Sequence, residues 1–325
     1  MDKALSVNRL AWKLAEILLD NQDFYGVTAS KTSSGATVVD AGVNAPGGFQ
    51  AGRIITEICM GGCGKAHIGF KNYGDLELPS ITVCTDQPAI AALGSQFAGW
   101  RIKEGDSVAI GSGPARALAL KPKEIYQEIA YKDESDKAVL VLETDKPPSN
   151  ELIEKVVNAC HISPENLLVI FAPTASIAGL TQVAGRVVET GIHKLRTLGL
   201  SPLAVRYALG YAPIPPLCRE FEVAMARTND AILYGGTVYY TVEHDDEETL
   251  RKIVEQAPSK ASKSYGKPFL QIFKEADRDF YKIDHNLFAP AMLTITNVKT
   301  GRMFRAGQTN IEALKESFNF SGATL

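Results

Sequence analysis

Residues 172–198 read APTASIAGLTQVAGRVVETGIHKLRTL, and this stretch decides how the rest of the chain is interpreted. On a single helix, with about 100° between successive residues, its apolar side chains occupy one broad arc. The other arc carries a polar stripe of Gln182, Arg186, Glu189 and His193. Periodicity alone favours a solvated helix face, on which Arg186 and Glu189 form an i,i+3 ion pair worth roughly 0.3 kcal/mol. A functional pair in a site is the alternative.

The segment before this stretch predicts a strand, a helix and a second strand. Lys137–Glu143 and Leu167–Phe171 are apolar runs typical of strands, and Asn150–Cys160 is amphipathic at helical spacing. That order predicts a right-handed crossover between two parallel strands. The next helix then begins at the carboxyl end of its strand, where ligands bind in α/β sheets. Thr174 and Ser176 lie there, and are interpreted either as helix N-caps or as ligand-binding residues.

A glycine-rich turn follows the predicted strand Ser107–Ile110. It consists of Gly111, Ser112 and Gly113, and it leads into a helix that carries Arg116. Two interpretations stay open: a plain structural turn, or a cradle in which backbone N–H groups and the helix dipole bind phosphate or carboxylate. The turn matches neither a Walker A loop nor GxGxxG, which counts against a phosphotransferase.

The remaining elements complete an α/β protein. Residues 6–20 predict a helix, and the glycines of the loop Gly42–Gly52 permit close approach of a ligand. Ile54–Cys59 is rich in β-branched residues and is interpreted as a strand. A chain of 325 residues exceeds the usual size of one domain. We therefore expect two α/β lobes, residues 1–132 and 133–325. A discontinuous lobe, built from separate segments of the chain, is the alternative.

Composition excludes several classes of protein. A net charge of −3 provides no field to gather nucleic acid, and the hydrophobic fraction of 45% is ordinary for a globular protein. The apolar runs are short and interrupted, and the first helix is charged, so neither a membrane span nor a secretory signal is expected. Five scattered cysteines, an odd number, indicate reduced thiols. We expect a cytoplasmic protein.

A zinc site is conceivable but disfavoured. Cys59, Cys63 and His67 follow one another closely, yet their spacing matches no common zinc motif and the other histidines are distant. A cysteine in an apolar run is more often a small buried hydrophobe. We expect no metal.

Four long strings occur in the chain in the same order as in a known family. They are GSGPARALALKP at 111–122, APTASIAG with GRVVET at 172–190, TNDAILYGG at 228–236, and YGKPF with DFYKIDHNLFAPA at 265–291. Together they closely resemble methenyltetrahydromethanopterin cyclohydrolase, and the resemblance is colinear from Leu5 to a C-terminal hairpin that turns at residues 299–301.

The resemblance implies a fold and an assembly. It implies a two-lobed α/β subunit with a substrate pocket between the lobes, a homotrimer, and neither metal nor prosthetic group. The implied reaction is the reversible hydrolysis of 5,10-methenyl-tetrahydromethanopterin to the 5-formyl pterin, a step of one-carbon metabolism in methanogenesis or formaldehyde oxidation. The tetrahydromethanopterin derivative is then a substrate rather than a cofactor.

The resemblance also implies roles for residues. The family's catalytic Arg and Glu correspond to Arg186 and Glu189 in GRVVE. The methenyl bridge is an amidinium cation, so its carbon is already electrophilic and the reaction needs a base, which Glu189 can supply. Gly111–Arg116 is the first candidate for binding the carrier's anionic tail, and Lys121 is the second. The competing hypothesis is a non-catalytic binding protein for a pterin one-carbon carrier, which would not need both Arg186 and Glu189.

Overall fold

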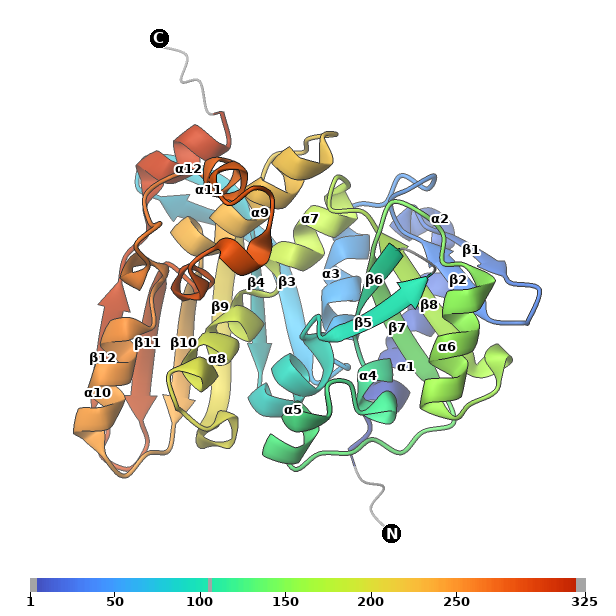
Figure 1. The fold of residues 1–325 in the computed structure, drawn as a ribbon, viewed down its shortest axis with the longest axis horizontal. Coiled ribbons are helices and arrows are strands. Elements are labelled where there is room, and N and C mark those ends of the chain that lie inside the picture. Colours follow the sequence, from blue (N-terminus) through green and yellow to red (C-terminus); the bar gives the residue numbers. More distant parts are fainter. Residues whose placement is uncertain (1–4, 105–106, 320–325) are drawn as a thin grey trace. The chain divides into compact units, whose positions relative to one another are not determined.

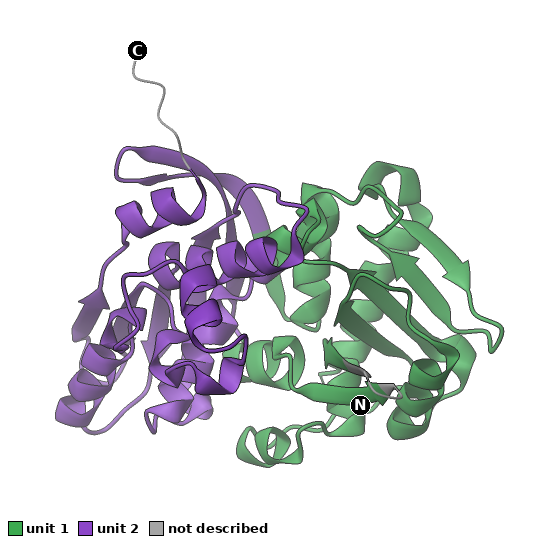
Figure 2. Cartoon of the chain, turned by 45° about the horizontal axis from the view of Figure 1, so that its top comes forward, with its two compact units in different colours: residues 1–66, 87–182 green, residues 67–86, 183–325 purple. Residues whose placement is uncertain are grey.

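The computed structural model describes residues 5–104 and 107–319 and divides the chain into two compact units (Figure 2). Unit 1 comprises residues 1–66 and 87–182, and unit 2 comprises residues 67–86 and 183–325. Each unit has its own mixed six-stranded sheet with helices (Figure 1). The expected α/β class with two lobes is confirmed.

The sheet of unit 1 has the strand order β1-β2-β8-β7-β6-β5. The strands are β1 (Thr28–Lys31), β2 (Thr37–Asp40), β5 (Trp100–Glu104), β6 (Ser107–Ser112), β7 (Ala138–Glu143) and β8 (Leu167–Ala172). Strands β2, β8 and β7 run parallel, while β1, β6 and β5 are joined antiparallel. The predicted crossover is confirmed, because α6 (Asn150–Cys160) connects the parallel strands β7 and β8. Since both strands pair within this sheet, the expected division at residue 132 falls inside unit 1.

Helices cover both faces of this sheet. They are α1 (Val7–Asp20), α2 (Gln22–Tyr25), α3 (Phe49–Cys59), the π-helix η1 (Ala89–Gln96), α4 (Ala115–Ala119), α5 (Lys123–Glu128), α6, the 3₁₀ turn η2 (Pro164–Asn166) and α7 (Ile177–Ala184). Alternate residues of β7 enter different cores: Val139 and Val141 pack with α1 and α3, whereas Leu140 and Leu142 pack with α6. Burial on both faces explains why β7 and β8 are continuous apolar runs.

The run Ile54–Cys59 is helical, so its interpretation as a strand was wrong. It is the second half of α3, and its apolar residues recur with Ala51 at helical spacing. Tertiary packing overrides β-propensity here. A Cβ added at Gly52 would lie 2.4 Å from Cβ of Thr181, so α3 packs closely against α7 only because this position is glycine.

The stretch 172–198 forms two helices rather than the single helix predicted. α7 ends at Ala184 and α8 (Val187–Thr197) begins after a turn at Gly185 and Arg186. A glycine inside a helix pattern weakens the helix, which accounts for a break at this point. The chain also passes from unit 1 to unit 2 within α7, between residues 182 and 183.

The sheet of unit 2 has the order β12-β11-β10-β9-β4-β3. Its strands are β3 (Gly64–Tyr73), β4 (Leu76–Thr85), β9 (Val205–Pro213), β10 (Thr237–Val242), β11 (Met292–Asn297) and β12 (Met303–Gly307). β10 and β11 are parallel, and β11 and β12 form the predicted hairpin. Gly301 in its turn has φ of 72°, a left-handed conformation that favours glycine.

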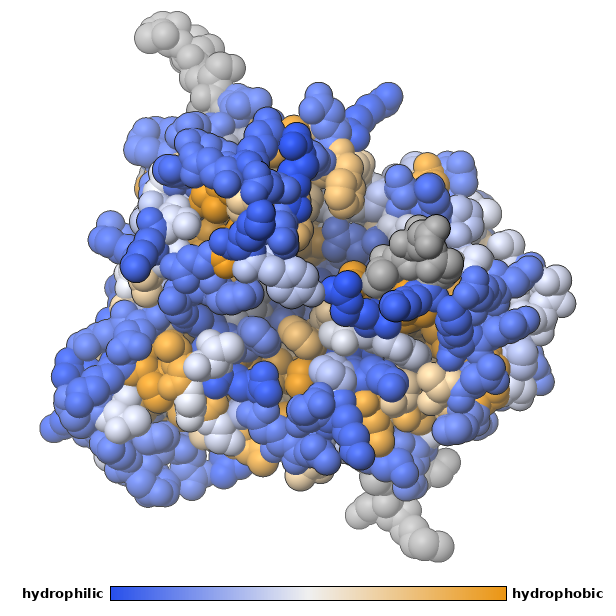
Figure 3. All heavy atoms as spheres, in the orientation of Figure 1, coloured by the Kyte–Doolittle hydropathy of each residue, from blue (hydrophilic) through white to orange (hydrophobic). Residues whose placement is uncertain are grey.

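Helices of unit 2 lie in front of the strands in Figure 1. They are α8, η3 (Pro202–Ala204), α9 (Phe221–Gly235), α10 (Glu247–Gln256), η4 (Ser259–Ala261), α11 (Phe269–Glu275), η5 (Phe280–Lys282), η6 (His285–Leu287) and α12 (Ile311–Ser317). Figure 3 shows mostly hydrophilic side chains on the outward side of α10. On the other face of the sheet, Tyr207, Leu209, Tyr239 and Met303 are exposed.

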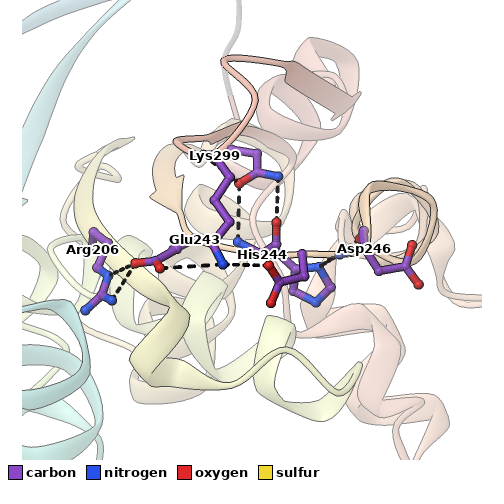
Figure 4. Close-up of polar contacts among 7 residues, drawn as sticks. Arg206, Glu243, His244, Asp246 and Lys299 are labelled. Atoms are coloured by element: carbon purple, nitrogen blue, oxygen red, sulfur yellow. Dashed lines mark hydrogen bonds and ion pairs between the residues drawn. The ribbon is translucent and has the colours of Figure 1, made fainter.

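A charged cluster joins the end of β10 to the β11–β12 hairpin (Figure 4). Glu243 pairs with Arg206 and with Lys299, and all three side chains are exposed. Exposed pairs of this kind contribute little to stability. The buried Asn297 does more, since its side chain bonds both the N–H and the carbonyl of His244.

Among the described residues, no helix combines the length and the apolar character needed to cross a bilayer.

Asp230 ties three helices of unit 2 together from a fully buried position. Its carboxyl group on α9 accepts the N–H of Phe269, at the start of α11, at 2.9 and 3.1 Å. It also accepts the hydroxyl of Ser317, at the end of α12, at 2.6 Å. Burial raises the pKa of Asp230 from 3.8 to about 7, although both hydrogen bonds act to lower it.

We expect Asp230→Asn to stabilise the protein increasingly as pH rises. The raised pKa means that the folded state keeps a proton on Asp230 that the unfolded chain releases above pH 3.8. The contribution of Asp230 to the free energy of unfolding is therefore fully present below pH 3.8. As pH rises further, this contribution falls by up to about 1.4 kcal/mol per pH unit until the pH passes the pKa of the folded state. Asn keeps the bond from Phe269 and removes the titration.

Urea unfolding of both proteins between pH 4 and 8 measures this difference. Ser317→Ala is the matched variant. It removes a hydrogen bond that lowers the pKa of Asp230, so the fall in unfolding free energy should continue to a higher pH. Parallel stability curves for wild type and Asp230→Asn would contradict the role of this carboxyl group.

Candidate functional site

Arg186 and Glu189 form an ion pair at the start of α8. The Arg186 Nη1 atom lies 3.8 Å from Glu189 Oε2, and the two side chains are only 12% and 11% exposed. Glu189 lies in the first turn of α8, where the helix dipole favours a carboxylate. The interpretation of this stripe as a solvated face was therefore wrong.

Two further members of the stripe are also withdrawn from solvent. Gln182 on α7 is 2% exposed, and His193 on α8 is half-buried. Burial lowers the pKa of His193, and the nearby Arg196 and His285 lower it further, which favours the neutral imidazole. The polar stripe that contains Arg186 and Glu189 is thus mostly withdrawn from solvent.

Glycines of unit 2 allow α8 to approach its sheet closely. A Cβ added at Gly210 of β9 would lie 3.0 Å from Cγ2 of Val188, and one added at Gly236 would lie 3.1 Å from Cγ2 of Val187. These distances are shorter than ordinary contacts between carbon atoms. The first turn of α8, which carries Glu189, therefore packs closely through Val187 and Val188, because Gly236 and Gly210 have no side chains to block these two valines.

Tyr240 and Gly191 make a third contact of this kind, and neither residue was predicted from the sequence to have a functional role. The hydroxyl of the fully buried Tyr240 donates to the carbonyl of Val188 at 2.8 Å. A Cβ added at Gly191 would lie 2.1 Å from that hydroxyl oxygen. The available signal was Gly191 itself, because glycine inside a helix pattern often marks close packing.

Lys194 attaches the other end of α8 to the segment before β11. It is 2% exposed, and its ammonium group donates to Oδ1 of Asn286 at 2.6 Å. Burial lowers the pKa of Lys194, while the nearby Asp284 acts to raise it. The helix that carries Arg186 and Glu189 is thus held near both of its ends.

In unit 1, Thr174 and Ser176 lie where the parallel strands end. Thr174 is fully buried and donates to Glu143, the last residue of β7. The Ser176 hydroxyl oxygen accepts the N–H of Gly179 at 3.0 Å, which confirms that Ser176 caps α7. The expected position of both residues at the carboxyl edge of the sheet is confirmed, and their role towards a ligand stays a prediction.

Asp40 organises the loop at the same edge. Its carboxylate accepts the backbone N–H groups of residues 42, 43, 44 and 45 at 2.7–3.2 Å. Burial acts to raise the pKa of Asp40, but these hydrogen bonds outweigh it and hold the pKa below its ordinary value. A pocket of about 270 Å³ opens beside Asp40, between β1, β2 and the loop. The loop expected to approach a ligand is thus ordered around one carboxylate.

The turn Gly111–Arg116 begins near the carboxyl end of β7 and leads away from it. β6 runs antiparallel to β7, so Gly111 pairs with Leu142, one residue before the Glu143 that Thr174 contacts. By Gly113 the chain has moved back to the level of residues 139–141 of β7. The first glycine of the turn therefore lies near Thr174, and the later residues lie towards the start of β7.

Arg116 is used inside unit 1. It is 0% exposed, and its guanidinium donates to the carbonyls of Lys121, Leu93 and Ser95 at 2.8, 3.1 and 3.1 Å. The charge also lies over the ring of Phe97, 5.3 Å from its centroid. Gly111, Ser112 and Gly113 are buried with it. The structural interpretation of this turn fits these contacts.

Metal-ligating side chains are not grouped in the described part of the chain. There, no three His, Cys, Asp or Glu residues are placed to hold an ion. Burial and the nearby Asp133 raise the pKa of Cys63 to about 11, which disfavours the thiolate that zinc requires. Cys59 is fully buried, with its sulfur 3.7 Å from the hydroxyl of Ser112.

The arrangement at the start of α8 suits proton transfer. A carboxylate that is mostly withdrawn from water and paired with an arginine can accept and return a proton at a fixed place. A neighbouring guanidinium can also stabilise oxygen charge that develops in a reaction. Acid–base catalysis is the chemistry that this pair supports best.

Comparisons with known proteins agree with one another over nearly the whole chain. Residues 6–318 match the family described as Cyclohydrolase (MCH). A methenyltetrahydromethanopterin cyclohydrolase of Methanothermobacter marburgensis is 47% identical, covering 97% of this chain and 99% of its own. Proteins of the same name from Methanocaldococcus jannaschii and Methanococcoides burtonii are 45% and 43% identical, over 98% and 97% of this chain and 99% and 98% of their own.

We expect Arg116→Met to destabilise the protein by roughly 3–5 kcal/mol, because it leaves buried carbonyls without their donor. Thermal unfolding measures the loss, and Lys123→Ala, an exposed position nearby, is the control and should be neutral. An Arg116→Met protein of unchanged stability that binds anionic ligands more weakly would instead show that this arginine serves a ligand.

Proposed function

The chain belongs to the cyclohydrolase (MCH) family, and we propose that it catalyses the reversible hydrolysis of 5,10-methenyl-tetrahydromethanopterin to 5-formyl-tetrahydromethanopterin. It is then a hydrolase that acts on a cyclic amidine C–N bond in one-carbon metabolism. The names and near-complete coverage of the relatives support the reaction. The observation that carries the proposal within the molecule is the nearly buried pair of Arg186 and Glu189.

Glu189 serves as the base and then as the acid. The amidinium carbon of the substrate already carries positive charge, so water can add once a base takes its proton. Glu189 accepts that proton and returns it to the departing N10, which opens the ring. Positioned proton transfer of this kind is typically worth about 10²–10⁴-fold in rate. Arg186 keeps the carboxylate ionised against burial and stabilises oxygen charge in the tetrahedral adduct.

Residues of unit 1 are the proposed binding residues. Thr174 and Ser176 are the proposed substrate-binding residues of unit 1, supported by their place at the carboxyl edge of parallel strands. A tail-binding role for Gly111, Ser112, Gly113 and Arg116 stays a prediction that would require this buried turn to open. Lys121, which is exposed beside the turn, is the alternative contact for the tail.

The proposed enzyme is a cytoplasmic homotrimer that binds no nucleic acid. The exposed face of the unit 2 sheet supports self-association. There Leu209 pairs across the strands with Tyr239, and Tyr207 and Met303 lie on the same side. Tyr207, Leu209 and Tyr239 are neighbours on this face, and exposed apolar patches commonly mark an interface.

We expect Glu189→Gln to keep KM and lose about 10²–10⁴-fold in kcat, because it removes a proton acceptor needed mainly in the transition state. The measurement is the loss of methenyl-pterin absorbance after the purified protein is added. Glu248→Gln, at an exposed position on α10, is the control.

Two outcomes would count against the proposal. A wild-type protein that binds the methenyl pterin without turnover would be a binding protein. A Glu189→Gln variant with wild-type kcat would place the acid–base group elsewhere.

We also propose that no metal or prosthetic group takes part, since the cationic substrate needs no Lewis acid. Prolonged chelation should leave activity unchanged, and Cys63→Ala should stay active because its thiol is a buried hydrophobe. Elemental analysis of the purified protein checks this directly. Activity that is lost on chelation and restored by zinc would overturn it.

A further inference from the structure

We infer that Tyr240 is a positioning residue for Glu189, and that Gly191 is glycine so that the Tyr240 hydroxyl can reach the backbone of α8. This inference rests on the proposed acid–base role of Glu189. Tyr240 comes from the middle of β10 and contacts α8 at a backbone carbonyl, the neighbour in sequence of the Glu189 backbone.

The contact is specific in its geometry. Tyr240 is fully buried, and its hydroxyl donates to the Val188 carbonyl at 2.8 Å. Burial, and next the negative charge of Glu189, raise the pKa of Tyr240 well above its ordinary value, so the hydroxyl stays protonated and remains a donor.

Gly191 leaves the space that this hydroxyl occupies. A Cβ at this position would lie 2.1 Å from the hydroxyl oxygen, 3.1 Å from the ring carbon Cζ and 3.3 Å from Cγ of Pro290. The first distance is far below any real contact, whereas the other two need only small shifts. The hydroxyl oxygen is therefore the atom that makes glycine necessary.

The contact fixes the first turn of α8, which carries Glu189. Val188 and Gly191 are three residues apart and share the helix face towards the sheet, while Glu189 projects from another face. A hydrogen bond to Val188 sets both the rotation of α8 and its height over β10. Loss of this bond would let the Glu189 carboxylate shift relative to the substrate, and small misplacement of a catalytic group is costly.

The test uses Tyr240→Phe, Gly191→Ala and the double variant, with kcat, KM and thermal midpoint measured for each. A loss of about 1 kcal/mol, typical of one hydrogen bond, lowers a rate roughly 5-fold when it is expressed in the activation free energy. Tyr240→Phe should therefore lower kcat by about that factor with KM nearly unchanged. Gly191→Ala should lose most activity or fail to fold. The double variant should recover towards Tyr240→Phe, because the atom that the new Cβ meets is gone.

Tyr239→Phe is the matched control. Its hydroxyl bonds Thr296 at 2.7 Å, and its side chain lies on the exposed face of the same strand. It should keep the wild-type kcat.

Each outcome decides a separate point. A Tyr240→Phe protein with a lower thermal midpoint but wild-type kcat at temperatures where it is folded would reduce Tyr240 to a structural residue. A double variant no better than Gly191→Ala would show that the hydroxyl is not the constraint on residue 191. Wild-type kcat in Glu189→Gln would remove the proposed function, whatever the tyrosine variants do.

Discussion

The hydrogen bond from Tyr240 to Val188 is the contact on which the proposed chemistry of unit 2 depends. It joins the middle of a sheet to the first turn of the helix that carries Arg186 and Glu189. The contact exists only because Gly191 leaves room for the hydroxyl, while Gly210 and Gly236 leave room for the two valines. An ion pair that would add little on an open surface is thereby held in one place, out of water.

The two units use the α/β arrangement differently. In unit 1, helices pack on both faces of the sheet, so the strands β7 and β8 are buried. Thr174 and Ser176 follow the carboxyl end of β8. In unit 2, the strands alternate between a face buried against helices and a face with exposed aromatic side chains. The carboxyl edge in unit 1 is where we propose ligand binding, and the exposed face in unit 2 is where we propose self-association.

Buried charges in both units serve backbone groups. Arg116 satisfies three carbonyls in unit 1, and Asp40 accepts four N–H groups of one loop. In unit 2, the Asp230 carboxyl group accepts the backbone N–H of Phe269 at the start of α11 and the side-chain hydroxyl of Ser317 at the end of α12. A charged residue beside a glycine-rich turn looks like a ligand site in a sequence. Here the Arg116 guanidinium donates to backbone carbonyls that are withdrawn from water.

The sequence by itself determined the α/β class, the crossover through α6, the C-terminal hairpin, and Arg186 with Glu189 as the candidate pair. These features follow from local periodicity, from turn residues and from the sequence segments shared with the family, all of which can be recognised within short stretches of sequence. Tertiary structure alone decided that Ile54–Cys59 is helical, that α7 and α8 are separate, and that the turn beginning at Gly111 leads away from Thr174 to a buried Arg116. It also decided the part that Tyr240 plays. Each of these features depends on contacts between residues that are distant in the sequence. Local sequence pattern specifies neither the direction of β6 relative to β7 nor the close approach of the Tyr240 hydroxyl to Gly191.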